Sequence, residues 1–390
     1  MAVFTDLTHP KYREQFAEVE KAYSIHIVGI EAMVAGSVDT KFKILIRDSA
    51  DPLVLTIHET PDVSAAGLSG AASANILHYI DYLAGSTGIV LDRRGETVNL
   101  GFLKPLKACL PGQTEAPFLA LTFEGVQKII SIVPFIHGKS FKNSPGELVN
   151  PAEAHLAGRA LAAYATIARS YPDASSFGNN NFEEYVTEVS RLAGEQEVMS
   201  RLGFVLSAGR LHGAAARAAG RDYLAEMGED GRVLLESWRD FQSATSPFFP
   251  TLIHGDLFTD NALIDENGCL IMIDFSQVTN GDAGLDIGVA INSWASQNGR
   301  LVKANIIRFL DGIDSVTPLT GAALSFIPTF ARFGAFRWET FRIQRIEMQD
   351  PRQFDMRSPA EFQSLRAAWR PLQGSFAGLE SLSDLINIEF

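Results

Sequence analysis

Polar side chains gather between Leu252 and Phe275, where two apolar runs end on groups able to do chemistry. Asp256 lies in the loop after the first run, Asn261 follows five residues later, and Asp274 ends the second run. Carboxylates are costly to keep beside buried strands, which favours a chemical role. A loop aspartate can accept a hydroxyl proton, and Mg²⁺ binds amide and carboxylate oxygens alongside phosphate. We therefore predict Asp256 as the base of a phosphoryl transfer, with Asn261 and Asp274 as Mg²⁺ ligands.

A hairpin is expected between the two predicted ligands, because Asn267–Gly268 separates two apolar runs. A two-residue turn there pairs Glu266 with Cys269 and sets a register in which Asn261 lies directly opposite Asp274. Cross-strand partners have Cβ atoms roughly 4.5–5.5 Å apart, which suits two ligands of one cation. The expected register thus brings the two ligands to one metal.

Simpler interpretations exist for single residues of this stretch. Asp and Asn are common in turns, so "DLFTDN" alone is compatible with an ordinary loop. We interpret His254 as a residue that braces the loop and Asp260 as a local hydrogen-bond former. The H-G-D-x-x-x-x-N spacing, the hairpin and the Asp-Phe that follows it together favour the catalytic interpretation.

The surrounding elements predict an α+β chain with a two-lobed, protein-kinase-like fold. Apolar runs typical of strands dominate up to about residue 133, and helical periodicity dominates after Gly138. We expect a β-rich nucleotide-binding lobe at 1–133, a connector at 134–138, and a helical catalytic and substrate-binding lobe within 134–390. The expected strands are 41–46, 52–58, 118–123 and 128–135, and the expected helical regions are 71–84, 151–170, 182–243 and 321–348.

The bulk composition narrows the class of protein. The chain has 390 residues, 46% hydrophobic and 20% charged, with a formal net charge of −13. This acidity argues against nucleic acid or an anionic membrane as a partner, whereas magnesium can neutralise a nucleotide locally. Two cysteines, no signal-peptide pattern and no membrane-spanning run lead us to expect a cytoplasmic protein.

These motifs resemble the aminoglycoside phosphotransferase and choline kinase superfamily, which has a kinase-like fold. The resemblance rests on "HGDLFTDN" and "IDFSQVTNGDAGLDIG". Within that superfamily the chain looks most similar to homoserine kinases, through "PLVLTIHE", "DIGVAINSW" and a late helix with Arg332, Arg337 and Arg342. The resemblance implies a kinase that uses ATP and Mg²⁺ to phosphorylate homoserine or a related hydroxy amino acid. The alternatives are an aminoglycoside or choline-type amino-alcohol phosphotransferase, and a nucleotide-binding pseudokinase without turnover.

The chain departs from the resembled enzymes near both predicted substrates. Homoserine kinases usually carry Ala where Gly255 stands. Protein kinases place a Lys on the third strand and a Glu on the first helix. Here the strand reads Leu55-Thr56-Ile57, and the helix at 71–84 contains no Glu. Lys43 and Arg47 are the candidates for neutralising the phosphates instead.

The nucleotide site is expected at two places. Ser37 and Thr40 could offer hydroxyl and backbone N–H groups to phosphate. The same residues are also compatible with an ordinary hairpin turn. In the resembled fold, adenine binds to the connector. The carbonyl of Pro134 would accept from the adenine amino group and the N–H of Ile136 would donate to the ring. A rigid linker is the simpler reading of the same residues.

The acceptor is expected to be a small hydroxylated amine or amino acid. Binding the carboxylate of homoserine selectively needs a buried cation, ideally arginine. Arg337 and Arg342 lie about 140° apart around a helix, so we expect only one of them, Arg337, to face the substrate. Asp282 or Glu339 could bind the ammonium group. The sequence carries no indication of the oligomeric state.

Overall fold

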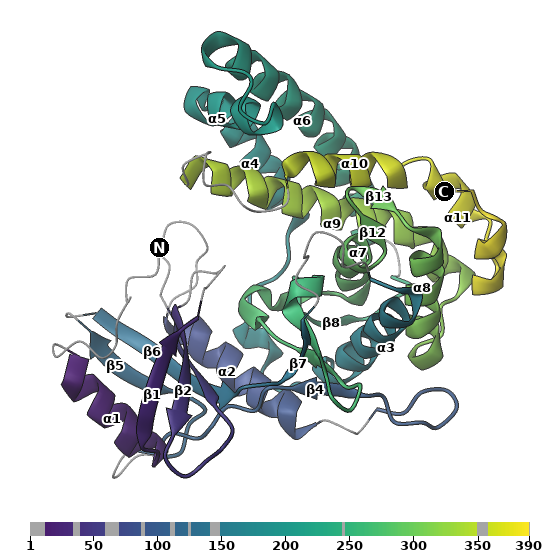
Figure 1. Cartoon of the computed structure of the whole chain (residues 1–390). Helices are drawn as coiled ribbons and strands as arrows, with labels where there is room; N and C mark the ends of the chain where they lie inside the picture. Colours follow the sequence, from purple (N-terminus) through teal and green to yellow (C-terminus); the bar gives the residue numbers. More distant parts are fainter. Residues whose placement is uncertain are drawn as a thin grey trace.

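The computed structural model describes residues 12–33, 40–58, 70–86, 90–109, 114–123, 126–140, 149–243, 246–348 and 358–389. Its N-terminal part is built on a β-sheet and its larger C-terminal part is mostly helical (Figure 1). This arrangement confirms the expected α+β class. No helix within the described ranges is long and apolar enough to cross a membrane.

The N-terminal sheet has five antiparallel strands in the order β1-β2-β3-β6-β5. Because side chains alternate along a strand, this sheet has two distinct faces. One face packs against α1, and Phe42, Ile44 and Leu55 are buried there with Val19 of that helix. The other face carries Lys41. The strands are β1 (Ile27–Ala32), β2 (Thr40–Ile46), β3 (Leu53–His58), β5 (Leu119–Phe123) and β6 (Val126–Pro134), and the helix is α1 (Arg13–Tyr23).

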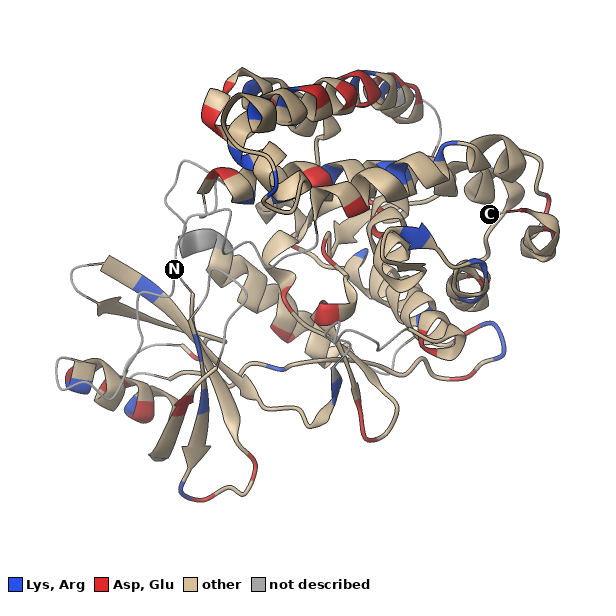
Figure 2. Cartoon of the chain, turned by 45° about the horizontal axis from the view of Figure 1, so that its top comes forward, with Lys and Arg blue, Asp and Glu red and all other residues tan. Residues whose placement is uncertain are grey.

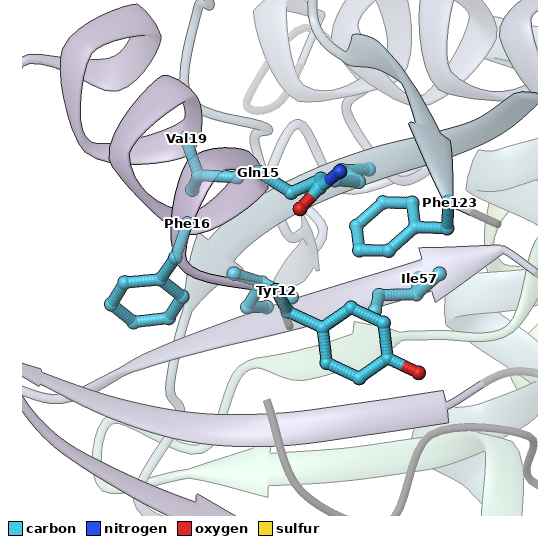
Figure 3. A pocket seen from close by; sticks show the side chains of 8 residues that line it. Tyr12, Gln15, Phe16, Val19, Ile57 and Phe123 are labelled. Carbon is cyan, nitrogen blue, oxygen red and sulfur yellow. The ribbon is translucent and has the colours of Figure 1, made fainter. Parts of the chain in front are cut away.

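A small hollow remains between α1 and its face of the sheet (Figure 3). Its lining is mostly apolar and includes Tyr12, Phe16, Ile57 and Phe123. The cavity volume is about 10 Å³, which is about the space that one water molecule needs. We therefore regard it as a packing gap, on the face of the sheet opposite Lys41.

A second, four-stranded sheet lies in the helical part, in the order β4-β10-β9-β7. Here β4 (Leu100–Phe102) runs parallel to β10 (Leu270–Met272), and β9 (Ala262–Asp265) pairs with β10 and with β7 (Gly138–Ser140). Beside it, β8 (Pro250–Ile253) pairs with β11 (Thr279–Asp282). A short ladder joins β12 (Ser296–Gln297) to β13 (Arg300–Leu301).

The largest core lies around this second sheet and includes residues of α3, α7 and α8. Helices α4, α5 and α6 lie above the sheet in the view of Figure 1 and belong to a separate core with α9. Helix α3 begins as predicted, with Pro151 in its first turn and Asn150 and Glu153 forming a capping box. The helices are α2 (Gly70–Gly85), α3 (Pro151–Ala168), α4 (Phe182–Gly194), α5 (Gln196–Leu206), α6 (Gly213–Ser243), α7 (Ala283–Trp294), α8 (Lys303–Val316), α9 (Gly321–Met348), α10 (Pro359–Trp369) and α11 (Leu372–Ala377).

A buried ionic network ties three of these helices together. Asp230 of α6 accepts from Arg332 of α9 at 2.8 Å and also from Arg366 of α10. The Nε of Arg366 donates to Glu339 of α9 at 2.9 Å, and the hydroxyl of Tyr223 donates to the same carboxylate at 2.7 Å. Buried charges need partners of this kind, so the network fixes α10 against α9 and α6.

The predicted strands and helices are confirmed as elements, but the division at residue 133 stays a proposal. Leu100 and Phe102 precede that boundary and yet belong to the core of the helical part, as does Tyr79 of α2. The connector is short: β6 ends at Pro134 and β7 begins at Gly138.

Candidate active site

The loop after β8 is held by a buried carboxylate from another element. The backbone N–H groups of His254 and Gly255 donate to the two carboxylate oxygens of Asp286, each at 2.7 Å. Asp286 lies in the first turn of α7. Burial raises its pKa to about 6, although the two N–H bonds and the charge of Arg337 act in the opposite direction. The loop that carries Asp256 is thereby fixed to the start of α7.

His254 links this loop to the end of β10. Its Nε2 lies 3.1 Å from the Ile273 carbonyl, and its Nδ1 lies 3.3 Å from the backbone N of Asp256. This pattern assigns a neutral ring with its proton on Nε2. Burial lowers the pKa of His254 to about 4, against the opposing charge of Asp274. The predicted bracing role of His254 is confirmed.

Asp256 is half-buried beside Asn261. The amide Nδ2 of Asn261 donates to Asp256 Oδ2 at 2.8 Å and to the Asp256 backbone carbonyl at 2.7 Å. The other carboxylate oxygen, Oδ1, is buried and accepts no hydrogen bond within the described part of the chain. Burial and the nearby charge of Asp274 raise the pKa of Asp256 well above its ordinary value, while Arg337 lowers it. The structure therefore brings together Asp256, Asn261 and Asp274.

The predicted hairpin register is wrong by one residue. The loop has three residues, Glu266–Gly268, because the Asp265 N–H bonds to the Cys269 carbonyl at 3.0 Å. Gly268 takes a left-handed φ of 73°, and the Asp265 carboxylate accepts from the backbone N of Asn267 at 2.9 Å. A three-residue loop ending on a left-handed glycine is the next most common hairpin after the two-residue type.

The corrected register places Ile273, and not Asp274, opposite Asn261. The Ile273 N–H donates to the Asn261 carbonyl at 3.0 Å, one pair beyond Met272–Ala262. Asp274 follows the ladder with a left-handed backbone, φ 61° and ψ 70°, and caps the short helix Phe275–Gln277. It reaches the site through this bend in the chain.

The two proposed ligands fit a magnesium ion. Burial alone would raise the pKa of Asp274, but the charge of Lys41 and a hydrogen bond from Ser276 hold it below its ordinary value. An ionised carboxylate is therefore favoured there. The Asn261 amide nitrogen is engaged with Asp256, which leaves its oxygen for a cation. No cluster of three or more His, Cys, Asp or Glu ligands occurs in the described ranges. Mg²⁺ needs no such cluster, since it is commonly bound by one or two protein groups plus phosphates and water.

Two arginines of α9 carry charge that acts on Asp256. Burial and Asp274 raise the pKa of Asp256, whereas the positive charges of Arg337 and Arg342 lower it. Both guanidinium groups lie near the ring of Trp338, at 5.4 and 5.3 Å from its centroid. That Arg337 alone faces the substrate stays a prediction.

Arg337 also braces the loop. It donates to the Gly255 carbonyl, to the Tyr185 hydroxyl at 2.9 Å and to Gln277 Oε1 at 3.2 Å. Both Arg337 and Arg342 are 8% exposed, so their charges act in a largely buried setting.

The two acids proposed for an ammonium group have structural roles instead. Glu339 is 0% exposed and pairs with Arg366 and Tyr223, so it has no surface for a substrate. Asp282 is the N-cap of α7, accepting from the Gly284 N–H at 2.8 Å and from the Ser246 hydroxyl at 2.7 Å. The proposed acceptor site therefore does not include Glu339 or Asp282.

The connector offers backbone groups where adenine binding was predicted. The Phe135 N–H donates to the Pro52 carbonyl at 3.1 Å, which makes Pro134 and Leu53 a non-hydrogen-bonded pair. The Pro134 carbonyl therefore points away from β3. The N–H of Ile136 donates to no backbone carbonyl among the described residues. Both groups stay available to a ligand.

The other predicted phosphate ligands are less well placed. Ser37 lies outside the described residues. Thr40 is 3% exposed and alternates onto the face of Phe42, away from Lys41. Arg47 reaches His26 at 2.7 Å beyond the far end of β2, and the Lys43 ammonium lies 4.8 Å from the Phe135 ring centroid.

Asp286 was predicted only as part of the resembled motif, and neither its bonds to the loop of Asp256 nor the position of Lys41 opposite Thr56 was predicted. An acid in the first turn of a helix was visible, but an N-terminal acid usually serves its own helix. Lys41 looked like any half-buried lysine of a strand. Only their partners, on elements far away in the chain, distinguish them.

Known proteins share both sequence and fold with this chain. The sequence model of the Phosphotransferase enzyme family matches residues 102–319. A homoserine kinase from Neisseria meningitidis serogroup B is 33% identical over 93 residues, 24% of this chain and 30% of that protein. One from Rhizobium johnstonii is 28% identical over 148 residues, 33% of this chain and 46% of that protein. The chain therefore spans less than half of the length of these relatives.

Solved structures of kinases cover nearly the whole chain. A microcompartment-associated aminopropanol kinase matches with a TM-score of 0.63 at 14% identity, covering 93% of this chain and 98% of that one. Amicoumacin kinase in complex with AMP-PNP, Ca²⁺ and Ami matches with a TM-score of 0.59 at 14% identity, covering 98% and 100%. At these identities the likeness establishes the kinase-like fold, as predicted.

Proposed function

The chain belongs to the phosphotransferase enzyme family, and we propose that it transfers the γ-phosphoryl group of ATP to a hydroxyl group of a small molecule. The observation that carries this proposal is the environment of Asp256. One carboxylate oxygen is fixed by Asn261, and the other is buried without a donor within the described part of the chain. Such an oxygen is oriented to accept a proton.

The proposed step assigns a role to each residue. The acceptor oxygen forms a bond to the γ-phosphorus, and its proton passes to Asp256 Oδ1. The bond from that phosphorus to the bridging oxygen breaks, and ADP leaves with the electron pair. Arg337 and Arg342 favour the ionised form of Asp256 that a base requires. Mg²⁺, held by Asn261 and Asp274, would neutralise charge on the phosphates.

Arg342, a largely buried arginine whose charge acts on Asp256, supports an acceptor that carries an anionic group, whereas Arg337 is held by Gly255, Tyr185 and Gln277. Guanidinium groups bind carboxylates through paired charge-assisted hydrogen bonds, and they stay charged when buried. A hydroxy amino acid such as homoserine has this carboxylate beside its hydroxyl. A polycationic aminoglycoside would need acidic groups there, and Glu339 and Asp282 are engaged within the chain. We therefore propose homoserine or a related hydroxy amino acid as the acceptor.

A panel assay tests the proposal. ADP release would be measured with L-homoserine, other hydroxy amino acids, amino alcohols and aminoglycosides. We expect the highest kcat/KM for an acceptor with a carboxylate. The Arg342→Ala variant should raise KM for that acceptor while leaving the KM for ATP unchanged. Turnover of amino alcohols alone would overturn the acceptor, and nucleotide binding without turnover of any acceptor would favour a pseudokinase.

The proposed base is tested by Asp256→Asn. An amide cannot take the proton, and general-base assistance is worth roughly 10²–10⁴-fold, so kcat should fall by about that factor. ATP affinity should remain, because Asp256 is not a proposed metal ligand. Asp260→Asn is the matched control, since Asp260 is exposed and four residues away. A kcat of Asp256→Asn within a few-fold of the control would remove Asp256 from the chemistry.

A further inference from the structure

The third strand of the sheet lacks the lysine that protein kinases use to bind ATP phosphates. The strand β3 carries Val54, Thr56 and His58 on the face opposite α1, and none of them is a permanent cation. A kinase site without a cation here would leave the phosphate charge to the metal alone. A positive charge for the phosphates would therefore have to come from an element other than β3.

The register of the sheet puts Lys41 beside the vacant position. Lys41 of β2 is the direct partner of Thr56 of β3. Partners in an antiparallel pair project to the same face, with Cβ atoms roughly 4.5–5.5 Å apart. A lysine one strand away can therefore bring its ammonium group to the region that a β3 lysine would occupy.

Lys41 also lies near the N-terminal end of β2, where the pairing with β1 ends. The Met33 N–H donates to the Lys41 carbonyl at 3.0 Å, so Lys41 closes the ladder next to the turn between β1 and β2. Lys43 lies two residues further along the same face, roughly 6.8 Å away, with its ammonium over Phe135 of the connector. The two lysines therefore project from one face of the sheet, Lys43 beside the connector and Lys41 at the end of the β1–β2 ladder.

The other described cations near this part of the sheet have different partners: Arg47 contacts His26, and Lys107 pairs with Asp81 of α2.

We propose that Lys41 binds the ATP phosphates in place of the missing lysine of β3, and this role rests on the proposed kinase function. The positive charge comes from the neighbouring strand, directly opposite Thr56. Lys43 and Arg47, which the sequence suggested for this task, do not take it.

Binding measurements separate this role from a general effect on the fold. Affinities for ATP and adenosine would be measured with Mg²⁺ for the parent, Lys41→Met, Lys41→Arg and Lys43→Met. A lost charge-assisted contact should weaken ATP binding of Lys41→Met by about 10- to 100-fold. Adenosine affinity should stay at the parent value, because adenosine has no phosphate. Lys41→Arg should retain more ATP affinity than Lys41→Met.

Lys43→Met is the matched control, with the same substitution on the same strand face. It should change ATP and adenosine affinity by the same factor. Unaltered ATP affinity in Lys41→Met, or an equal loss for adenosine, would overturn the role of Lys41 while the kinase proposal stands. A parent chain that binds no ATP would overturn both.

Discussion

Gly255, in the loop that carries Asp256, has no room for an added Cβ atom. Its φ is +72°, and an added Cβ would lie 2.7 Å from the Gln277 carbonyl oxygen and 3.2 Å from Nη1 of Arg337. Left-handed backbone disfavours any L side chain, and the neighbouring carbonyl is backbone that cannot move freely.

Gly255→Ala should therefore lower the free energy of unfolding by about 1–3 kcal/mol. Urea unfolding would measure the change. Gly228→Ala in α6 is the control, because a Cβ there meets nothing within 4 Å. That change should stabilise the chain by about 0.4–1 kcal/mol. If Gly255→Ala behaved like the control, the positive φ would not be required.

The buried neutral ring of His254 makes stability depend on pH. Burial lowers its folded pKa from 6.5 to about 4, so only the unfolded chain gains this proton between those values. The His254 contribution to the free energy of unfolding is present above pH 6.5 and is lost as pH falls towards 4. At 1.36 kcal/mol per pKa unit the loss is about 3 kcal/mol. Asp286 acts in the opposite sense, because its raised pKa of about 6 gives the folded state the extra proton.

A difference measurement isolates the histidine. His254→Gln keeps a donor for the Ile273 carbonyl but does not titrate. The stability advantage of the parent over His254→Gln should shrink by about 3 kcal/mol between pH 7 and pH 4. The effect of Asp286 cancels in this comparison. A constant difference across the range would mean that His254 is not neutral in the folded state.

At the scale of elements, the hairpin β9–β10 and the bend after it bring the proposed metal ligands together. Asn261 precedes β9, and Asp274 leaves the ladder with a left-handed backbone. In the ladder the partner of Asn261 is Ile273, so Asp274 lies one residue beyond that pair. The left-handed backbone of Asp274 changes the direction of its side chain.

Asp274→Ala should weaken nucleotide binding in the presence of Mg²⁺ and leave metal-free binding much less affected. The reason is that the ionised carboxylate at 274 acts on the nucleotide through the metal. Calorimetric titrations with and without Mg²⁺ would measure both affinities. Asp265→Ala, in the turn of the same hairpin, is the control for damage to the fold. Equal Mg²⁺ dependence in parent and Asp274→Ala would refute the ligand assignment.

At the scale of the whole molecule, stability depends on where charges lie. Figure 2 shows acidic and basic residues interspersed along the helices at the top of the view. On α6, Arg232 forms exposed ion pairs with Glu229 and Glu236. Arg366 also meets two carboxylates, but with 3% of its side chain exposed. An arginine that pairs with two carboxylates is therefore expected to affect stability much more at position 366, where it is buried, than at position 232, where it is exposed.

Arg366→Met should cost about 3–5 kcal/mol of unfolding free energy, because Arg366 is the cation shared by the buried carboxylates Asp230 and Glu339, and Glu339 would keep only the hydroxyl of Tyr223. Arg232→Met, with exposed partners, should leave stability unchanged within error. Chemical unfolding of both variants would test the contrast. If Arg366→Met does not fold, Arg366→Lys should fold with a smaller loss. Equal stability of Arg366→Met and Arg232→Met would contradict the role of the network.

The sequence by itself determined the elements and the identity of the proposed catalytic groups. Strand and helix positions follow from periodicity, which is a local property, so α3, α9 and the strands β2, β3, β5 and β6 of the first sheet were predicted, whereas β1 was not. The spacing from Asp256 to Asn261 lies within one loop, and the end of β10 marks Asp274. The bracing role of His254 followed from its place after a buried strand.

Only the tertiary structure decided the relations between distant segments. The hairpin register depended on whether Gly268 closes a two- or three-residue loop, and the Asp265 carboxylate selected the latter. Lys41 opposite Thr56 and Asp286 beneath Gly255 depend on contacts between elements far apart in the chain. Periodicity and spacing describe neighbours along the chain, whereas strand pairing and packing decide which distant charges meet.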